Sequence, residues 1–151
     1  MKETFEITET SRKLLYHLIQ NLSLEQLNMI PTGFNNNIIW NVGHIIVVQQ
    51  MLVYNLSGLP MKTSADFVSR YKKGTRPKEL VSEAEVLLIK GLLFSTIAQT
   101  QTDFEQNIFK DFTEYTVMTG FVIKNANDAL AFNYYHEALH TGIIMSLRKL
   151  V

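Results

Sequence analysis

Apolar residues recur along the chain at spacings of three and four, the pattern of amphipathic helices, and the alternation typical of strands is rare. The pattern predicts helices over about 4–22, 37–57 and 82–107, and a last helix from about 125 to the C-terminus. Strong helix breakers are few, since the 151 residues include only 3 prolines and 7 glycines. The sequence therefore predicts an all-α fold, a four-helix bundle.

Local signals support the ends of these helices. Ser23 with Gln26 fits a capping box and predicts a short helical turn, and Ser82 with Glu85 fits another at the start of the third long helix. Gly58 suits a left-handed stop after the second helix. Asparagines supply further caps, at 35–37 before the second helix and at 125 or 127 before the last.

The first two long helices differ in the distribution of their apolar residues. The first carries a stripe that should face the core, made of Ile7, Leu14, Leu15, Leu18, Ile19 and Leu22. His17 points roughly 130° from the mean direction of that stripe, so we expect it to face solvent. The second helix is apolar nearly all round and belongs inside the protein.

Two connections carry distinct patterns. Residues 59–81 form a long link with one short helix opened by Ser64, and such a length suits a crossover between parallel helices. This link is either a solvated loop or a cover that meets an anionic substrate, because its middle is basic: Arg70, Lys72, Lys73, Arg76 and Lys78. Residues 110–124, rich in β-branched and aromatic side chains, predict an extended loop or a weak hairpin.

Composition narrows the class of protein. Hydrophobic residues make up 46% and charged residues 19%, which predicts one globular domain over residues 1–151. Lys plus Arg equals Asp plus Glu at 14 each, so neither nucleic acid nor an anionic membrane is an expected partner. Cysteine is absent, so a metal site would use nitrogen and oxygen ligands. The beginning of the sequence lacks an apolar signal core, and we expect a cytoplasmic protein.

Three histidines are the strongest candidates for chemistry. His136 and His140 differ in direction by only about 40° on the last helix, and both rings can reach one ion. The apolar residues that share their side, Phe132, Leu139, Ile143 and Leu147, predict that the pair is buried, whereas Glu137 should face water. His44 lies on the most apolar helix, with Trp40 and Val48 one turn to either side. Three imidazoles suit a borderline divalent ion with an open coordination position.

The alternative is that the histidines are hydrogen-bonded core residues, which is the commoner role of a single buried histidine. Asn41 and Asn133, each about one turn before a histidine, are candidates for orienting the rings or are simply satisfied polar groups. Tyr134 and Tyr135 are packing residues or line an entrance.

The segments around the histidines resemble the DinB/YfiT-like superfamily. Ile38-Ile39-Trp40-Asn41-Val42-Gly43-His44-Ile45 is similar to its second-helix motif, and Tyr135-His136-Glu137-Ala138-Leu139-His140-Thr141-Gly142 to its last-helix motif. The resemblance spans nearly the whole chain. It implies an up-down-down-up four-helix bundle, usually a homodimer, with a divalent metal held by His44, His136 and His140.

Members of that superfamily with assigned reactions include S-transferases and isomerases that use low-molecular-weight thiols. The leading hypothesis is therefore a zinc- or nickel-dependent transferase in which an external thiol attacks a small electrophile, with no catalytic residue assigned on the chain itself. A metal-dependent hydrolase is the second hypothesis, and a non-catalytic metal-binding or structural bundle is the third. The spacing does not decide between the metals.

Overall fold

The protein is mostly helical, and the computed structural model describes residues 2–151. Four long elements dominate: α1 (Lys2–Ile19), α3 (Ile38–Gln50) continued by the π-helical turn η1 (Met51–Asn55), α5 (Glu83–Glu105) and α6 (Ala126–Leu147). The short helices are α2 (Leu24–Asn28) and α4 (Ala65–Tyr71). The strands β1 (Tyr115–Thr116) and β2 (Val122–Ile123) pair antiparallel, with Tyr115 opposite Ile123.

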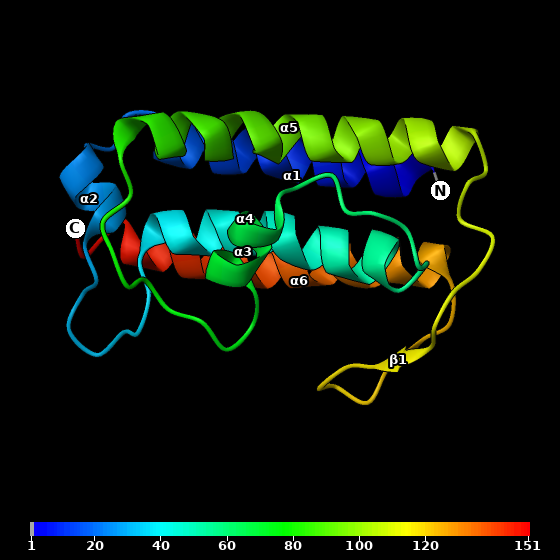
Figure 1. Cartoon of the computed structure of the whole chain (residues 1–151). Coiled ribbons are helices and arrows are strands. Elements are labelled where there is room, and N and C mark those ends of the chain that lie inside the picture. Colours follow the sequence, from blue (N-terminus) through cyan, green and yellow to red (C-terminus); the bar gives the residue numbers. More distant parts are fainter. Residues whose placement is uncertain (1) are drawn as a thin grey trace.

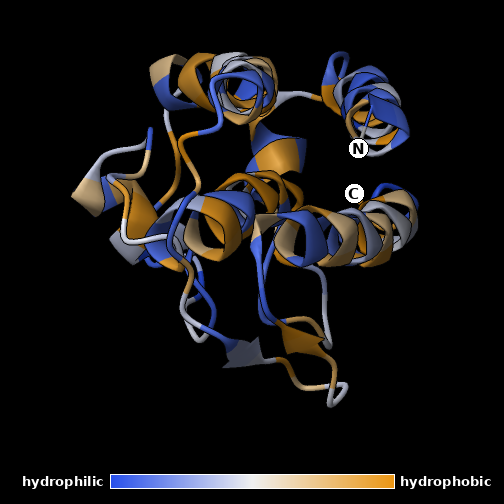
Figure 2. Ribbon diagram, turned by 90° about the vertical axis from the view of Figure 1, so that its right-hand side faces the viewer, coloured by the Kyte–Doolittle hydropathy of each residue, from blue (hydrophilic) through white to orange (hydrophobic). Residues whose placement is uncertain are grey.

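The long helices lie in two layers. Figure 1 shows α1 and α5 side by side above α3 and α6, and α3 runs in the same direction as α5 but opposite to α1 and α6. Seen along the helices, α1 lies over α6 and α5 over α3, and the hairpin projects from the lower layer (Figure 2). The lower pair, α3 and α6, carries the three histidines.

The structure confirms the predicted helix caps. These caps could be predicted because each depends on residues close in sequence. Ser23 and Gln26 form both hydrogen bonds of a capping box at α2, and the side chain of Ser64 accepts the Phe67 N–H at α4. Asn37, Ser82 and Asn125 cap the other helices that were expected to begin near them. Gly58 has a φ of +67° after η1, as a left-handed stop requires. The predicted hairpin in residues 110–124 is also present.

Two apolar clusters form the core, and a polar layer separates them. One cluster contains Leu15 on α1 and Ile144 on α6, and the other contains Phe5 and Leu130 on the same two helices. The buried polar residues between the clusters come from every long helix: Thr8, Arg12, Gln49, Gln50, Thr96, Thr100, Asn133, Glu137 and Thr141.

This layer corrects part of the predicted face of the first helix, of which Leu15, Leu18 and Ile19 are buried as predicted. Thr8 and Arg12 are buried, whereas Ile7 and Leu14 are 43% and 47% exposed. The helix also ends earlier than expected, at Ile19.

Among residues 2–151, no helix combines the length and the apolar character needed to cross a bilayer.

Candidate metal centre

Three imidazoles from two helices meet between α3 and α6. Each of His44, His136 and His140 offers one ring nitrogen, and these atoms all lie within 4.8 Å of one another. The ring of His44 is centred 5.2 Å from that of His136 and 4.8 Å from that of His140, and the two α6 rings are 4.5 Å apart. The structure therefore brings together all three histidines that the sequence analysis selected, in a group that could hold a metal ion.

The remaining ring nitrogens of two histidines have defined partners. Nδ1 of His44 donates to the main-chain oxygen of Tyr71 at 2.6 Å, and Nδ1 of His140 donates to Oδ1 of Asn41 at 2.8 Å. Because both partners are acceptors, each Nδ1 carries the proton and each Nε2 keeps a free lone pair. Metal-binding histidines are typically oriented by such hydrogen bonds.

Asn41 is itself held in one orientation. Its Nδ2 donates to the main-chain oxygen of Asn37 at 2.7 Å and to Oδ1 of Asn36 at 3.0 Å. These two bonds direct Oδ1 of Asn41 toward His140. The run of three asparagines before α3 therefore caps the helix and also orients a ring on α6.

His136 provides a direct test of whether the site fits an ion. Its Nδ1 is buried and has no hydrogen-bond partner in residues 2–151. Buried polar atoms in native proteins are nearly always paired, so an unpaired nitrogen beside two other imidazoles fits a group that binds a cation. This donor set of neutral nitrogens fits a borderline divalent ion such as zinc or nickel.

The surroundings keep the rings uncharged. Burial, followed by the charges of His140 and His44, lowers the pKa of His136 to about 3. Burial and then the charge of His44 lower the pKa of His140 to about 4. Burial also lowers the pKa of His44, although its bond to the Tyr71 carbonyl acts in the opposite direction. Neutral rings at pH 7 are ready to donate lone pairs to a cation.

Trp40 and Tyr71 form the wall beside His44. The indole of Trp40 stacks on the His44 ring at 4.7 Å and 13°, which confirms that they share one side of α3. The Tyr71 ring packs on Gly43, where a Cβ atom would lie 2.5 Å from the ring. Only glycine allows this approach, which places the Tyr71 carbonyl against His44. The sequence analysis missed Tyr71. The glycine directly before His44 indicates that some group packs closely there, but nothing in the sequence shows that this group is Tyr71.

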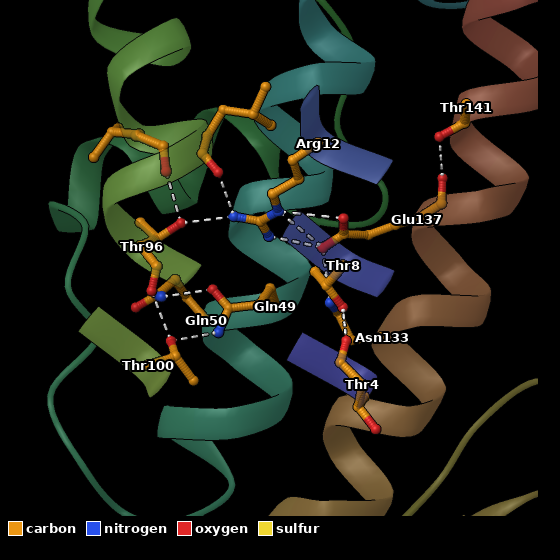
Figure 3. A network of polar contacts seen from close by, with 12 residues as sticks. Thr4, Thr8, Arg12, Gln49, Gln50, Thr96, Thr100, Asn133, Glu137 and Thr141 are labelled. Carbon is orange, nitrogen blue, oxygen red and sulfur yellow. Dashed lines mark hydrogen bonds and ion pairs between the residues drawn. The ribbon is translucent and has the colours of Figure 1, made fainter. Parts of the chain in front are cut away.

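The glutamate between the two α6 histidines does not face water, contrary to the prediction. Glu137 is fully buried and forms an ion pair of 2.7 Å with Arg12 of α1, which is also fully buried. Figure 3 shows the two side chains meeting inside the protein, and Asn133 donates to the same carboxylate at 2.7 Å. Asn133 therefore orients Glu137 rather than a histidine, and Glu137 points into the polar layer.

The prediction of which side of α6 is buried was also partly wrong. Leu139 and Ile143 are 50% and 37% exposed, while Leu147 is buried as predicted. The buried face is centred instead on the polar side chains of Asn133, Glu137 and Thr141. The histidines lie at the edge of that face and are partly buried.

Other candidate residues lie outside the group. His17 is exposed, as predicted, and its Nδ1 contacts the side chain of Gln20 at 2.9 Å. Tyr134 and Tyr135 are 40% and 46% exposed, and Tyr135 contacts the ring of Phe132. Neither tyrosine belongs to the packed core.

The mostly helical fold and the three converging histidines define the class of protein: a helical protein with a candidate metal site. The DinB superfamily model matches residues 7–144, and the chain belongs to this superfamily. No curated protein matches the sequence significantly.

Proposed function

We propose that the protein binds one divalent metal ion through His44, His136 and His140 and is an enzyme that transfers a low-molecular-weight thiol to a small electrophile. The observation that carries the proposal is the convergence of three neutral imidazoles, one with an unpaired buried nitrogen. Zinc and nickel suit this donor set best. When bound, such an ion supplies Lewis acidity that lowers the pKa of a thiol.

The chain's own residues would hold the site rather than react. Tyr71 and Asn41 fix the rings of His44 and His140, and the stacked Trp40 excludes water from one side of His44. The nucleophile must come from outside, since the sequence contains no cysteine. In the reaction the thiol loses its proton to solvent, its sulfur forms a bond to the electrophilic carbon, and the leaving group departs with the electron pair.

The position of Glu137 favours transfer over hydrolysis. Metal-dependent hydrolysis commonly uses a carboxylate as general base beside the metal. Glu137 is the acidic residue nearest the histidines in sequence, but both of its oxygens accept hydrogen bonds from Arg12. A carboxylate held in this way is not available to take a proton from water, which makes the hydrolase the weaker candidate.

The experiment follows the loss of free thiol when the zinc- or nickel-loaded protein is mixed with 1-chloro-2,4-dinitrobenzene and a series of cellular thiols. We expect consumption of at least one thiol by the native protein and none by the His140→Ala variant. Metal binding without consumption of any thiol would contradict the transferase and leave a hydrolase or a non-catalytic metal-binding protein.

We infer that the helices form a single-domain four-helix bundle in an up-down-down-up arrangement, with residues 59–81 as the crossover between the second and third long helices. The parallel directions of α3 and α5 in Figure 1 support this interpretation. Limited proteolysis should leave one protected fragment that includes both α1 and α6. Cleavage into two stable halves would contradict a single domain.

We also propose that the protein is a homodimer, as the family resemblance implies. Exposed apolar side chains support a second copy as the partner, because Ile7, Leu14 and Met145 line a groove between α1 and α6. Light scattering should give twice the chain mass, and Leu14→Glu should reduce it toward the monomer. A monomeric native protein would refute the proposal.

A further inference from the structure

A concave site lies close to the histidines, because its lining includes Trp40 and Tyr71, which both contact His44. It is a cavity of about 310 Å³ between the beginning of α3, α4 and residues 75–81, and we call it the basic cavity. Its lining includes Trp40, Tyr71, Val81, Arg70, Arg76 and Lys78. Its volume lies at the lower end of the range for small-molecule sites.

The charge around the basic cavity is unlike that of the whole chain. Residues 70–78 contain Arg70, Lys72, Lys73, Arg76 and Lys78 and no acidic residue, although cations and acids are equal at 14 each over the full sequence. Two acidic residues, Asp66 and Glu79, also line the cavity. The lining itself holds three cations, Arg70, Arg76 and Lys78, against these two acidic residues.

Within residues 2–151, only one of these cations is neutralised by an ion pair. Arg70 is bound to Glu85 of α5 at 2.8 Å. In the described part of the chain no ion pair involves Arg76 or Lys78, and both residues are exposed at the cavity. Two free cations at the mouth of a small cavity are suited to hold one anionic group.

Part of the wall of the basic cavity is apolar, and the wall is firmly held. Trp40 and Val81 are buried core residues, and Nε1 of Trp40 donates to Oγ1 of Thr75 at 3.2 Å. The hydroxyl of Tyr71 and the side chain of Arg70 both bind Glu85, which fixes α4 to α5. A ligand would therefore meet an existing shape and would need little ordering of the chain.

We propose that the basic cavity binds a small organic anion, whose apolar body packs against the wall of Trp40 and Val81 and whose carboxylate lies at Arg76 and Lys78. The occupant would lie next to the metal centre, because two residues that line the cavity also contact His44: the Trp40 indole stacks on its ring, and the Tyr71 carbonyl accepts its Nδ1 proton. The basic cavity therefore provides a binding site for an anionic reactant or effector beside the histidines.

The sequence supplies its own reporter for this test, because Trp40 is the only tryptophan. Its fluorescence is followed while the protein is titrated with cyclohexanecarboxylate, with cyclohexanecarboxamide as the uncharged match and with inorganic phosphate as an anion without an apolar body. We expect a saturable change with the carboxylate and a much weaker response to the amide and to phosphate. No saturable response, or equal responses to carboxylate and amide, would overturn the proposal.

Charge reversal then locates the site. Arg76→Glu/Lys78→Glu should weaken carboxylate binding by at least about tenfold, because two charge-assisted contacts are replaced by repulsion. The control, Lys110→Glu/Lys124→Glu, makes the same change in net charge outside the cavity lining and should bind as the native protein does. Circular dichroism checks that both variants are folded. Equal weakening in both variants would show a general charge effect and contradict the assignment.

The His136→Ala variant separates this proposal from the metal proposal. It lacks a histidine of the metal centre but keeps every residue that lines the basic cavity. We expect it to bind the carboxylate normally. Loss of carboxylate binding in this variant would place the anion at the histidines and overturn the basic cavity.

Discussion

Arg12 and Glu137, 125 positions apart in the sequence, form a completely buried ion pair of 2.7 Å that joins α1 to α6 (Figure 3). The guanidinium also donates to the main-chain oxygen of Leu93 and to Oγ1 of Thr96, at 2.8 and 2.9 Å. One side chain thus connects three helices. Because Glu137 directly follows His136, the pair also fixes the rotation of α6 that turns the histidines toward α3.

Removal of one partner of this pair should be far more costly than removal of both. Arg12→Met leaves the charge of Glu137 buried without compensation, and we expect a loss of about 3–5 kcal/mol in the free energy of unfolding. Arg12→Met/Glu137→Leu should recover most of that loss. Urea unfolding at pH 7 measures all three proteins.

The control for this comparison is the exposed pair of Glu9 and Lys13 on the same helix, at 2.7 Å. Its double replacement by alanine should change the free energy of unfolding by less than about 1 kcal/mol. A single Arg12→Met variant that unfolds as the control does would show that the buried pair does not stabilise the fold.

Gly43→Ala should weaken metal binding as well as the fold. The new methyl group would lie 2.5 Å from the Tyr71 ring, so α4 must move and take the Tyr71 carbonyl away from His44. Metal affinity, measured by competition with a chelator, should fall by about 10–100-fold, the usual effect of losing a group that orients a ligand.

Gly91→Ala is the matched control, because Gly91 lies within α5 and a Cβ atom there would meet nothing within 4 Å. It should leave metal affinity unchanged and stabilise the protein by about 0.5–1 kcal/mol. Native metal affinity in Gly43→Ala would contradict the role given to Tyr71.

Asn41 should act on metal binding through the oxygen that accepts from His140. Asn41→Ala removes the acceptor for Nδ1 of His140, and we expect a loss of about 10–100-fold in metal affinity. Asn41→Asp keeps an acceptor for Nδ1 of His140 but loses the two hydrogen bonds donated by Nδ2, so it should lose less affinity than Asn41→Ala. The two variants are compared by the same competition titration. Equal losses in both would indicate that Asn41 serves only to build the start of α3.

Asp103 should contribute to the pH dependence of stability. Burial alone would raise the pKa of Asp103, but hydrogen bonds from Tyr54 and Gln99 and the charge of Lys62 lower it below its ordinary value of 3.8. A lowered folded-state pKa stabilises the protein above that ordinary value, and the stabilisation is lost as the pH falls through the folded-state pKa.

The difference in unfolding free energy between the native protein and Asp103→Asn should therefore be constant from pH 7 to about pH 5 and shrink below about pH 4. Urea unfolding at several pH values measures it. A difference that stays constant or grows toward acid pH would contradict this account.

The sequence predicted features that depend on neighbouring residues. The caps at Ser23, Ser64 and Ser82 needed only partners three residues away, and the helices begin where those caps lie. His136 and His140 could be placed on one side of a helix because their spacing alone determines it. That His44 would meet them followed from the resemblance.

The rotation of α1 and α6 could not be predicted, because the assumption that apolar residues face inward fails in a polar layer. The charges of Arg12 and Glu137 predict positions at the surface, because the sequence does not show that the two side chains pair in the core. Leu139 and Ile143 consequently appeared to mark the buried side, although both are exposed. The contact between Tyr71 and His44 depends on the path of residues 59–81, which no local pattern specifies.

The metal content of untagged protein tests the central claim most directly. Elemental analysis should find about one divalent ion per three-histidine site in the native protein and in His17→Ala, and none in His136→Ala or His140→Ala, while circular dichroism shows that all four remain helical. A native protein that contains no ion and whose melting temperature does not change on addition of zinc or nickel would contradict the account.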